Sequence, residues 1–146
     1  MKKLILSSVV LLTFALALLI FEMSSCKKAV AQTTPASSIL GLWTGTYKVD
    51  GNSGAGEQYF SFIIKPDGTM INDTKGEGQQ HLSPGTWSLK GDTLSCTFTC
   101  VYGLPSNIGI TETSTCIWDK TGKLTMGTWK NVPASGSGTF TLAKVN

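Results

Sequence analysis

Five side chains carry most of the chemical reactivity in this sequence, and their spacing limits what they can do. They are Cys96, Cys100, Cys116, the single histidine His81, and Glu112, which lies among apolar neighbours. On a strand, the Cys-x3-Cys spacing separates Cys96 from Cys100 by about 13 Å, at a rise of roughly 3.3 Å per residue. One zinc ion cannot bridge that distance. We therefore predict no metal site.

The cysteines belong to a predicted hairpin over residues 93–119, in which apolar and polar residues alternate. In the register that places the apolar sets on one face, Cys96 lies opposite Cys116 and Cys100 lies opposite Glu112. A directly cross-strand pair can form a disulfide, which an oxidising compartment would favour. We predict a Cys96–Cys116 disulfide. A Cys100–Cys116 disulfide and three buried free thiols are the alternatives.

Glu112 and His81 are the candidates for acid–base chemistry. This register puts Glu112 on the apolar face, where a carboxylate is costly unless it is hydrated, paired or bound to a ligand. A place near an open rim, or a one-residue slip that turns Glu112 to solvent, would remove that cost. His81 falls in a polar stretch, 75–84, predicted to be a loop, with no nucleophile or orienting carboxylate marked nearby. We predict neither enzymatic activity nor a cofactor.

The elements that position these residues are predicted to be strands. Eight strand candidates are separated by short turns rich in Gly, Pro, Asn and Asp, and none of the intervening segments suggests a crossover helix. The candidates are residues 40–49, 57–65, 69–73, 85–90, 93–102, 108–119, 123–130 and 138–143. Consecutive hairpins indicate an all-β antiparallel meander. Closure into a barrel would hide its apolar face and leave an interior for one small ligand; a β-sandwich is the alternative.

Aromatic residues are the candidates for lining such an interior, because ligand pockets are mostly apolar and aromatic with few polar groups. Together with the one carboxylate, the candidate ligand-binding residues are Trp87, Phe98, Tyr102, Glu112 and Trp118. Core packing is the commoner role of such rings. We assign Trp43, and Gly41 before it, to the structural core near the closed end.

The first 38 residues predict export. Lys2 and Lys3 precede a long apolar run, which is typical of a signal peptide. Small residues before Cys26 favour cleavage there and acylation of that cysteine, so we expect a signal peptide over 1–25, a tether over 26–38 and one domain over 39–146. We then expect the protein to lie in a bacterial cell envelope, where the lipid anchors it to a membrane. Cleavage after Ala31, giving a secreted or periplasmic protein, is the alternative.

Charge excludes one class of partner. From residue 26 onward the chain has ten lysines and eight carboxylates, a net charge of +2, and it has no arginine anywhere. This balance is too small to indicate nucleic-acid binding. Without arginine there is also no guanidinium for bidentate phosphate recognition.

Gly41-x-Trp43 on a first strand resembles the opening motif of lipocalin-like (calycin) barrels. Together with Gly85-Thr86-Trp87 and the final strand around Gly138, it is similar to small lipoproteins of the Bacteroidetes type. The resemblance implies a barrel that binds a small apolar or amphipathic ligand. It also implies a cation over Trp43, which Lys130 or Lys144 would supply here in place of arginine. A filled barrel that docks another envelope protein is the alternative function.

Overall fold

The structure is a computed structural model that describes residues 38–76, 78–133 and 135–145. The predicted signal peptide, Cys26 as the predicted site of acylation, and the predicted tether up to residue 37 lie outside the described residues, as does the last residue of the predicted domain. Among the residues that are described, no helix has the length and apolar character needed to cross a membrane.

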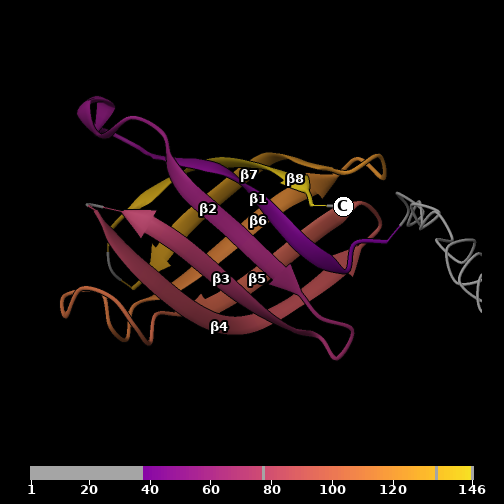
Figure 1. The fold of residues 1–146 in the computed structure, drawn as a ribbon, viewed down its shortest axis with the longest axis horizontal. Helices are drawn as coiled ribbons and strands as arrows, with labels where there is room; N and C mark the ends of the chain where they lie inside the picture. Colours follow the sequence, from indigo (N-terminus) through magenta and orange to yellow (C-terminus); the bar gives the residue numbers. More distant parts are fainter. Residues whose placement is uncertain (1–37, 77, 134, 146) are drawn as a thin grey trace, which may run out of the picture. The chain divides into compact units, whose positions relative to one another are not determined.

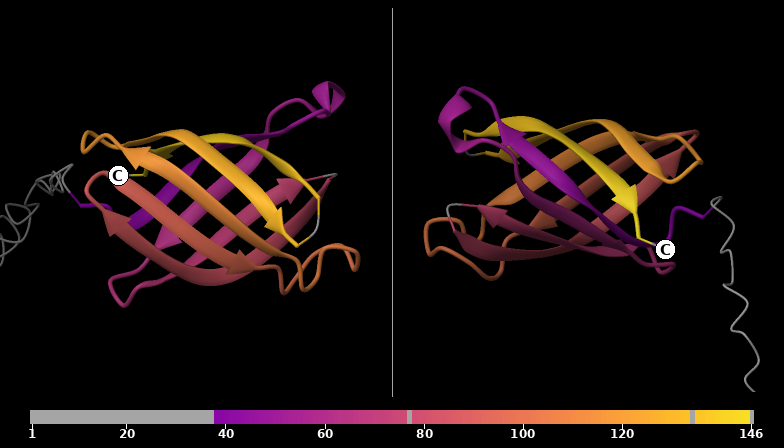
Figure 2. Two further views of the ribbon diagram at one scale, coloured as in Figure 1. Left: turned by 180° about the vertical axis from the view of Figure 1, so that it is seen from behind. Right: turned by 45° about the horizontal axis from the view of Figure 1, so that its top comes forward.

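Eight strands follow one another along the chain and form one closed barrel. They are β1 (Gly41–Val49), β2 (Gln58–Ile64), β3 (Thr69–Gly76), β4 (Gln79–Lys90), β5 (Thr93–Thr99), β6 (Thr111–Trp118), β7 (Lys123–Val132) and β8 (Ser137–Lys144), with a short 3-10 turn, η1 (Ser53–Ala55), between β1 and β2. Each strand pairs antiparallel with the next, and β8 pairs with β1 (Figure 1; Figure 2). The predicted all-β meander closed into a barrel is confirmed, and the β-sandwich alternative is wrong.

The alternation of residue types explains why the chain forms this barrel. On β5, Leu94, Cys96 and Phe98 are buried, whereas Thr93 and Thr97 are exposed. Successive side chains of a strand point to opposite faces, so this pattern turns one face of the sheet inward. Closure of β8 onto β1 then buries that face without leaving an unpaired edge.

Four glycines in the strands each lie beside an aromatic residue of the neighbouring strand. The pairs are Gly45 with Phe60, Gly85 with Phe98, Gly127 with Phe140, and Gly138 with Trp129. At Gly85 a Cβ atom would lie only 2.1 Å from the carbonyl oxygen of Thr97 and 2.5 Å from Cβ of Phe98. Each of these four glycines is followed by threonine and then by an aromatic residue. The absence of a side chain at the glycine leaves room for a ring and a backbone from the next strand.

Replacing Gly85 with alanine is therefore expected to destabilise the barrel by about 1–3 kcal/mol, since the backbone oxygen that the methyl group meets cannot move cheaply. Urea unfolding would measure the loss. Gly54→Ala is the matched control, because a Cβ there meets only the Asn52 side chain, at 3.8 Å. Equal stabilities of the two variants would show that the strands can separate to admit the methyl group.

The register of the β5–β6 hairpin differs from the expected one by two residues. Cys96 pairs with Ser114, and Leu94 pairs with Cys116. A shift of two keeps every side chain on its expected face, but it places Cys96 and Cys116 on a diagonal. Diagonal neighbours are about 7–8 Å apart, beyond the Cα separation that a disulfide favours.

The predicted Cys96–Cys116 disulfide is therefore wrong, and so is its alternative through Cys100. All three cysteines among the described residues are buried free thiols. Burial raises the pKa of Cys96 and of Cys116 to about 12. Both remain protonated at neutral pH, so neither is a reactive nucleophile.

Met126 lies outside the barrel, although alternation from Leu124 along β7 would place it on the inner face. Leu124 is fully buried, but Met126, two residues later, is 80% exposed. The pairing of β7 with β8 shifts by one residue between Leu124 and Gly127, and Met126 has a positive φ of 53°. The extra residue of this β-bulge reverses the alternation.

The end of the barrel that holds both termini of the domain is closed by packed side chains. Trp43 has no exposed surface, and its indole nitrogen donates a hydrogen bond to the carbonyl oxygen of Ile39 over 2.7 Å. Lys144 Nζ lies 5.7 Å from the centre of the Trp43 ring and donates a hydrogen bond to the carbonyl oxygen of Ser38. Of the two lysines considered for this position, Lys144 is the one that covers Trp43.

Candidate functional site

The opposite end of the barrel contains a cavity of about 250 Å³. Its walls come from the ends of β1, β3, β5 and β7 and the beginnings of β2, β4 and β6, together with residues of the connections over 50–57 and 100–110. In Figure 1 these connections lie at the end of the barrel away from the C-terminus. The barrel is thus filled at one end and hollow at the other.

One part of the cavity wall is aromatic. Its rings are those of Tyr47, Phe60, Phe98 and Trp129. The Tyr47 ring centre lies 5.4 Å from that of Phe60 and 5.9 Å from that of Trp129. Tilted and edge-on contacts at these distances are favourable for aromatic pairs. Trp129 is also held by a hydrogen bond of 3.1 Å from its indole nitrogen to the carbonyl oxygen of Lys48.

Another part of the wall is polar, although it belongs to the barrel interior. The polar side chains from the strands are Gln58, Asn72, Thr74, His81, Ser83, Glu112 and Asn131. Asn72 is only 2% exposed, and its amide nitrogen donates a hydrogen bond of 3.2 Å to the carbonyl oxygen of Ser61. A cavity with apolar rings on one part and hydrogen-bonding groups on another suits an amphipathic molecule.

His81 lies on a strand, and the predicted loop over residues 75–84 is wrong. The strands β3 and β4 extend through most of that stretch, and they place His81 and Ser83 in the cavity wall. The side-chain amide nitrogen of Asn107 lies 3.1 Å from Nε2 of His81, so the amide donates and the imidazole accepts. This contact joins β4 to the connection between β5 and β6.

That connection is also fastened to β4 through the backbone. The N–H of Leu82 donates to the carbonyl oxygen of Tyr102 over 3.0 Å, and the N–H of Val101 donates to the carbonyl oxygen of Leu82 over 2.9 Å. The imidazole of His81 packs so closely on Gly103 that a Cβ atom there would lie 2.0 Å from Cδ2 of the ring. The mouth of the cavity is therefore shaped by a loop with fixed contacts.

Among the described residues that line the cavity, Glu112 is the only carboxylate. It lies on β6 opposite Phe98 of β5 and Asn131 of β7. Its Oε1 atom is shielded from solvent and has no hydrogen-bond partner among the described residues, although the residue as a whole is only partly buried. Burial raises the pKa of Glu112 to about 8. The carboxyl group is therefore mostly protonated at neutral pH.

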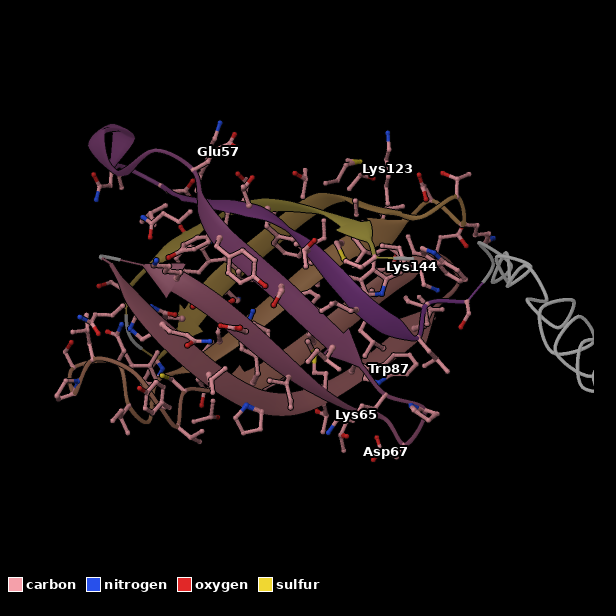
Figure 3. All side chains as sticks on the ribbon, in the orientation of Figure 1. Glu57, Lys65, Asp67, Trp87, Lys123 and Lys144 are labelled. Carbon is pink, nitrogen blue, oxygen red and sulfur yellow. The ribbon has the colours of Figure 1, made fainter. Side chains whose placement is uncertain are left out.

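Two of the five residues proposed from the sequence to bind a ligand line the cavity, namely Phe98 and Glu112. Tyr102 is 60% exposed on the loop, and Trp118 is buried on β6, outside the cavity wall. Trp87 lies at the other end of the barrel, where Figure 3 shows it beside Lys65, whose carbonyl oxygen accepts a hydrogen bond of 2.9 Å from its indole nitrogen.

Sequence reasoning missed most of the polar wall. In β4 the side chains at 81 and 83 point inward and are polar, so the usual apolar–polar alternation is inverted. Pro84, at the end of the stretch, also favours a loop, because proline has no N–H group to donate within a sheet. The detectable signal was the length of the stretch, because ten residues without secondary structure are unusual in a compact domain.

The cavity brings His81 and a carboxylate into one wall, which is an arrangement that catalysis would require. Among the described residues no hydrogen bond joins His81 to Glu112, Ser83 or Cys100. Nor does the described part of the chain contain a cluster of three residues able to hold a metal ion.

A comparison of the chain with protein-family models, with curated proteins and with solved structures found no match. The interpretation of the site therefore rests on its geometry.

Proposed function

We propose that this protein binds one small amphipathic molecule in the cavity at the open end of its barrel, without chemical conversion. The observation that supports this proposal is the cavity of about 250 Å³ with aromatic rings on one part of its wall and hydrogen-bonding side chains on another. Pockets for drug-sized ligands begin near 300 Å³. The ligand would therefore be at or below the small end of that range.

The same cavity argues against the alternative of a filled barrel that only docks another protein. A barrel that serves solely as a scaffold gains stability by filling its interior, as this one does around Trp43 and Leu94. Polar residues such as Asn72 and His81 in the other half reduce the apolar contact area. Their presence is better explained by contacts to a ligand.

The setting that we propose is a bacterial cell envelope, with the chain held to a membrane through lipid on Cys26. The closed eight-stranded meander and the Gly41-x-Trp43 motif support membership of the lipocalin-like barrels. Lys144 over Trp43 adds to that likeness. Such barrels carry small molecules, which agrees with the proposed binding role.

Native mass spectrometry of the protein purified gently from its own envelope tests the proposal. We expect a discrete extra mass, beyond any acyl group, that disappears on denaturation. In the variant Ser83→Phe that mass should be absent, because Ser83 lines the cavity and a phenyl ring would occupy it. Ser88→Phe is the matched control: it makes the same change on the exposed face of β4 and should keep the mass.

A bare polypeptide mass for a folded wild type would contradict the proposal. So would an extra mass that Ser83→Phe retains, since the molecule would then be bound elsewhere. Circular dichroism of each variant confirms that the barrel is folded before the masses are compared.

A further inference from the structure

The carboxyl group of Glu112 occupies a position that the protein alone leaves unsatisfied. Its Oε1 atom is screened from solvent and accepts no hydrogen bond from the described residues. A buried polar atom without a partner is unfavourable. Because Glu112 lines the cavity, a group on a bound molecule is in a position to form a hydrogen bond with its carboxyl group.

The charge of the other cavity residues indicates the sign of that group. No lysine is found among the lining residues in the part of the chain that the structure describes. At its rim Lys48 points outward and forms an ion pair of 3.1 Å with Glu57. An anionic ligand would therefore meet the carboxyl group of Glu112 with no cation in the wall to compensate. A cationic ligand would favour the ionised form of Glu112 and pair with its negative charge in a site of low dielectric constant.

The rings near Glu112 favour the same sign. Phe98 is its cross-strand neighbour, and Tyr47, Phe60 and Trp129 complete the aromatic part of the wall. The face of an aromatic ring carries partial negative charge and attracts an ammonium group within about 6 Å. The same rings also provide apolar surface for the rest of a small molecule.

We propose that the cavity selects a small primary amine with an apolar ring, and that Glu112 binds its ammonium group. This inference rests on the proposed binding function and specifies the class of ligand. The ammonium group donates a hydrogen bond to the carboxylate of Glu112, and the ring packs against Phe60, Phe98 and Trp129. Glu112 is thus a residue that determines specificity, in a barrel whose shape would otherwise also admit neutral and acidic molecules.

Binding of a cation should be coupled to release of a proton. Free Glu112 is protonated below its pKa of about 8, and it must ionise to pair with an ammonium group. The other titratable side chains in the cavity wall are those of Tyr47 on β1, His81 on β4 and Cys100 after β5, and that of Cys96 lies near Glu112 on β5. The described residues of β2, β3, β7 and β8 contribute no titratable group to the wall.

Three indoles of similar shape and different charge test the inference. They are tryptamine, which is a cation at pH 7, tryptophol, which is neutral, and indole-3-acetate, which is an anion. Isothermal titration calorimetry with the whole mature protein would measure each affinity. We expect tryptamine to bind at least about tenfold more tightly than tryptophol, as for a charge-assisted hydrogen bond, and indole-3-acetate to bind most weakly.

The variant Glu112→Gln separates charge from shape. It should lower the affinity for tryptamine by about tenfold or more and leave that for tryptophol unchanged. Glu57→Gln removes an exposed carboxylate outside the cavity and should leave both unchanged. Titration at pH 7 in buffers of different ionisation enthalpy should show release of close to one proton per tryptamine by wild type, and none by Glu112→Gln.

Equal affinities of wild type for tryptamine and tryptophol would overturn the inference and leave the proposed function intact. The same holds if native mass spectrometry shows a bound molecule but none of the three indoles binds. A bare mass together with no binding of any indole would instead overturn the proposed function itself.

Discussion

Replacing Glu112 with glutamine is expected to stabilise the folded protein at pH 8 by a few kcal/mol and to leave its stability at pH 4 unchanged. The pKa of this carboxyl group is raised in the folded state from 4.5 to about 8 by burial. Above pH 4.5 the unfolded chain therefore loses this proton, whereas the folded chain keeps it. Folding then costs progressively more as the pH rises towards 8, and the cost is constant above that value.

The size of the effect follows from the shift. Each pKa unit corresponds to about 1.4 kcal/mol, so 3.5 units would give about 5 kcal/mol as an upper limit. The residue is only partly shielded as a whole, and it faces a cavity that solvent enters. A loss of about 2–4 kcal/mol between pH 4.5 and pH 8 is therefore the expected range for wild type. Glutamine has a shape similar to that of glutamic acid and does not ionise. The stability of Glu112→Gln should therefore not fall over this pH range on account of residue 112.

Urea unfolding of both proteins at intervals from pH 4 to pH 9 measures this difference. Glu57→Gln is the control with the opposite sign, because hydrogen bonds from Lys48 and Thr46 lower the pKa of the exposed Glu57 carboxylate. Its removal should not stabilise the protein at any pH. If wild type and Glu112→Gln gave parallel curves of stability against pH, the carboxyl group of Glu112 would be hydrated in the folded state.

Trp43→Ala is expected to cost about 3–5 kcal/mol of folding stability, which is the range for truncating a buried tryptophan. The indole is fully buried at the closed end, bonds to the carbonyl oxygen of Ile39, and lies under Lys144. Its removal leaves a cavity, an unpaired carbonyl group and a lysine without its aromatic contact. These losses occur together, since the three groups touch the same ring.

Trp87→Ala provides the comparison for Trp43→Ala. Trp87 also donates a hydrogen bond to a backbone carbonyl oxygen, but its side chain is only partly buried. Unfolding in urea, followed by far-ultraviolet circular dichroism, should show a smaller loss for Trp87→Ala. Where Trp43→Ala is too unstable to fold, Trp43→Phe keeps a ring, loses the hydrogen bond, and should still lose about 1–3 kcal/mol. A larger loss for Trp87→Ala than for Trp43→Ala would contradict this assignment.

The features that follow local rules could be predicted from the sequence. Strands such as β5, with strict apolar–polar alternation, and turns such as Gly91-Asp92 specify the meander, and eight such strands specify closure. Placement of Trp43 in the core followed from the same reasoning. Glu112 was correctly placed on the inner face, because an error of two residues in register keeps the face of each side chain.

The features that depend on contacts distant in sequence could not be predicted. Hairpin register decides whether Cys96 meets Cys116, and it depends on the long connection over residues 100–110 between β5 and β6. Short turns fix the register of a hairpin, whereas a connection of this length does not. The bulge that exposes Met126 is one extra residue, whose place only the pairing with β8 reveals. His81 was missed because its strand faces a cavity, and a strand that faces a cavity need not be apolar inside.

The chain enters and leaves the barrel at the same end. Ser38 and Lys144 are hydrogen-bonded to each other there, beside Trp43. Whatever is joined to either terminus, a lipid on Cys26 included, is connected to the barrel at the end opposite the mouth of the cavity. The barrel can thus be immobilised on a sensor chip or fused to a reporter through either terminus, with the mouth left open for solutes.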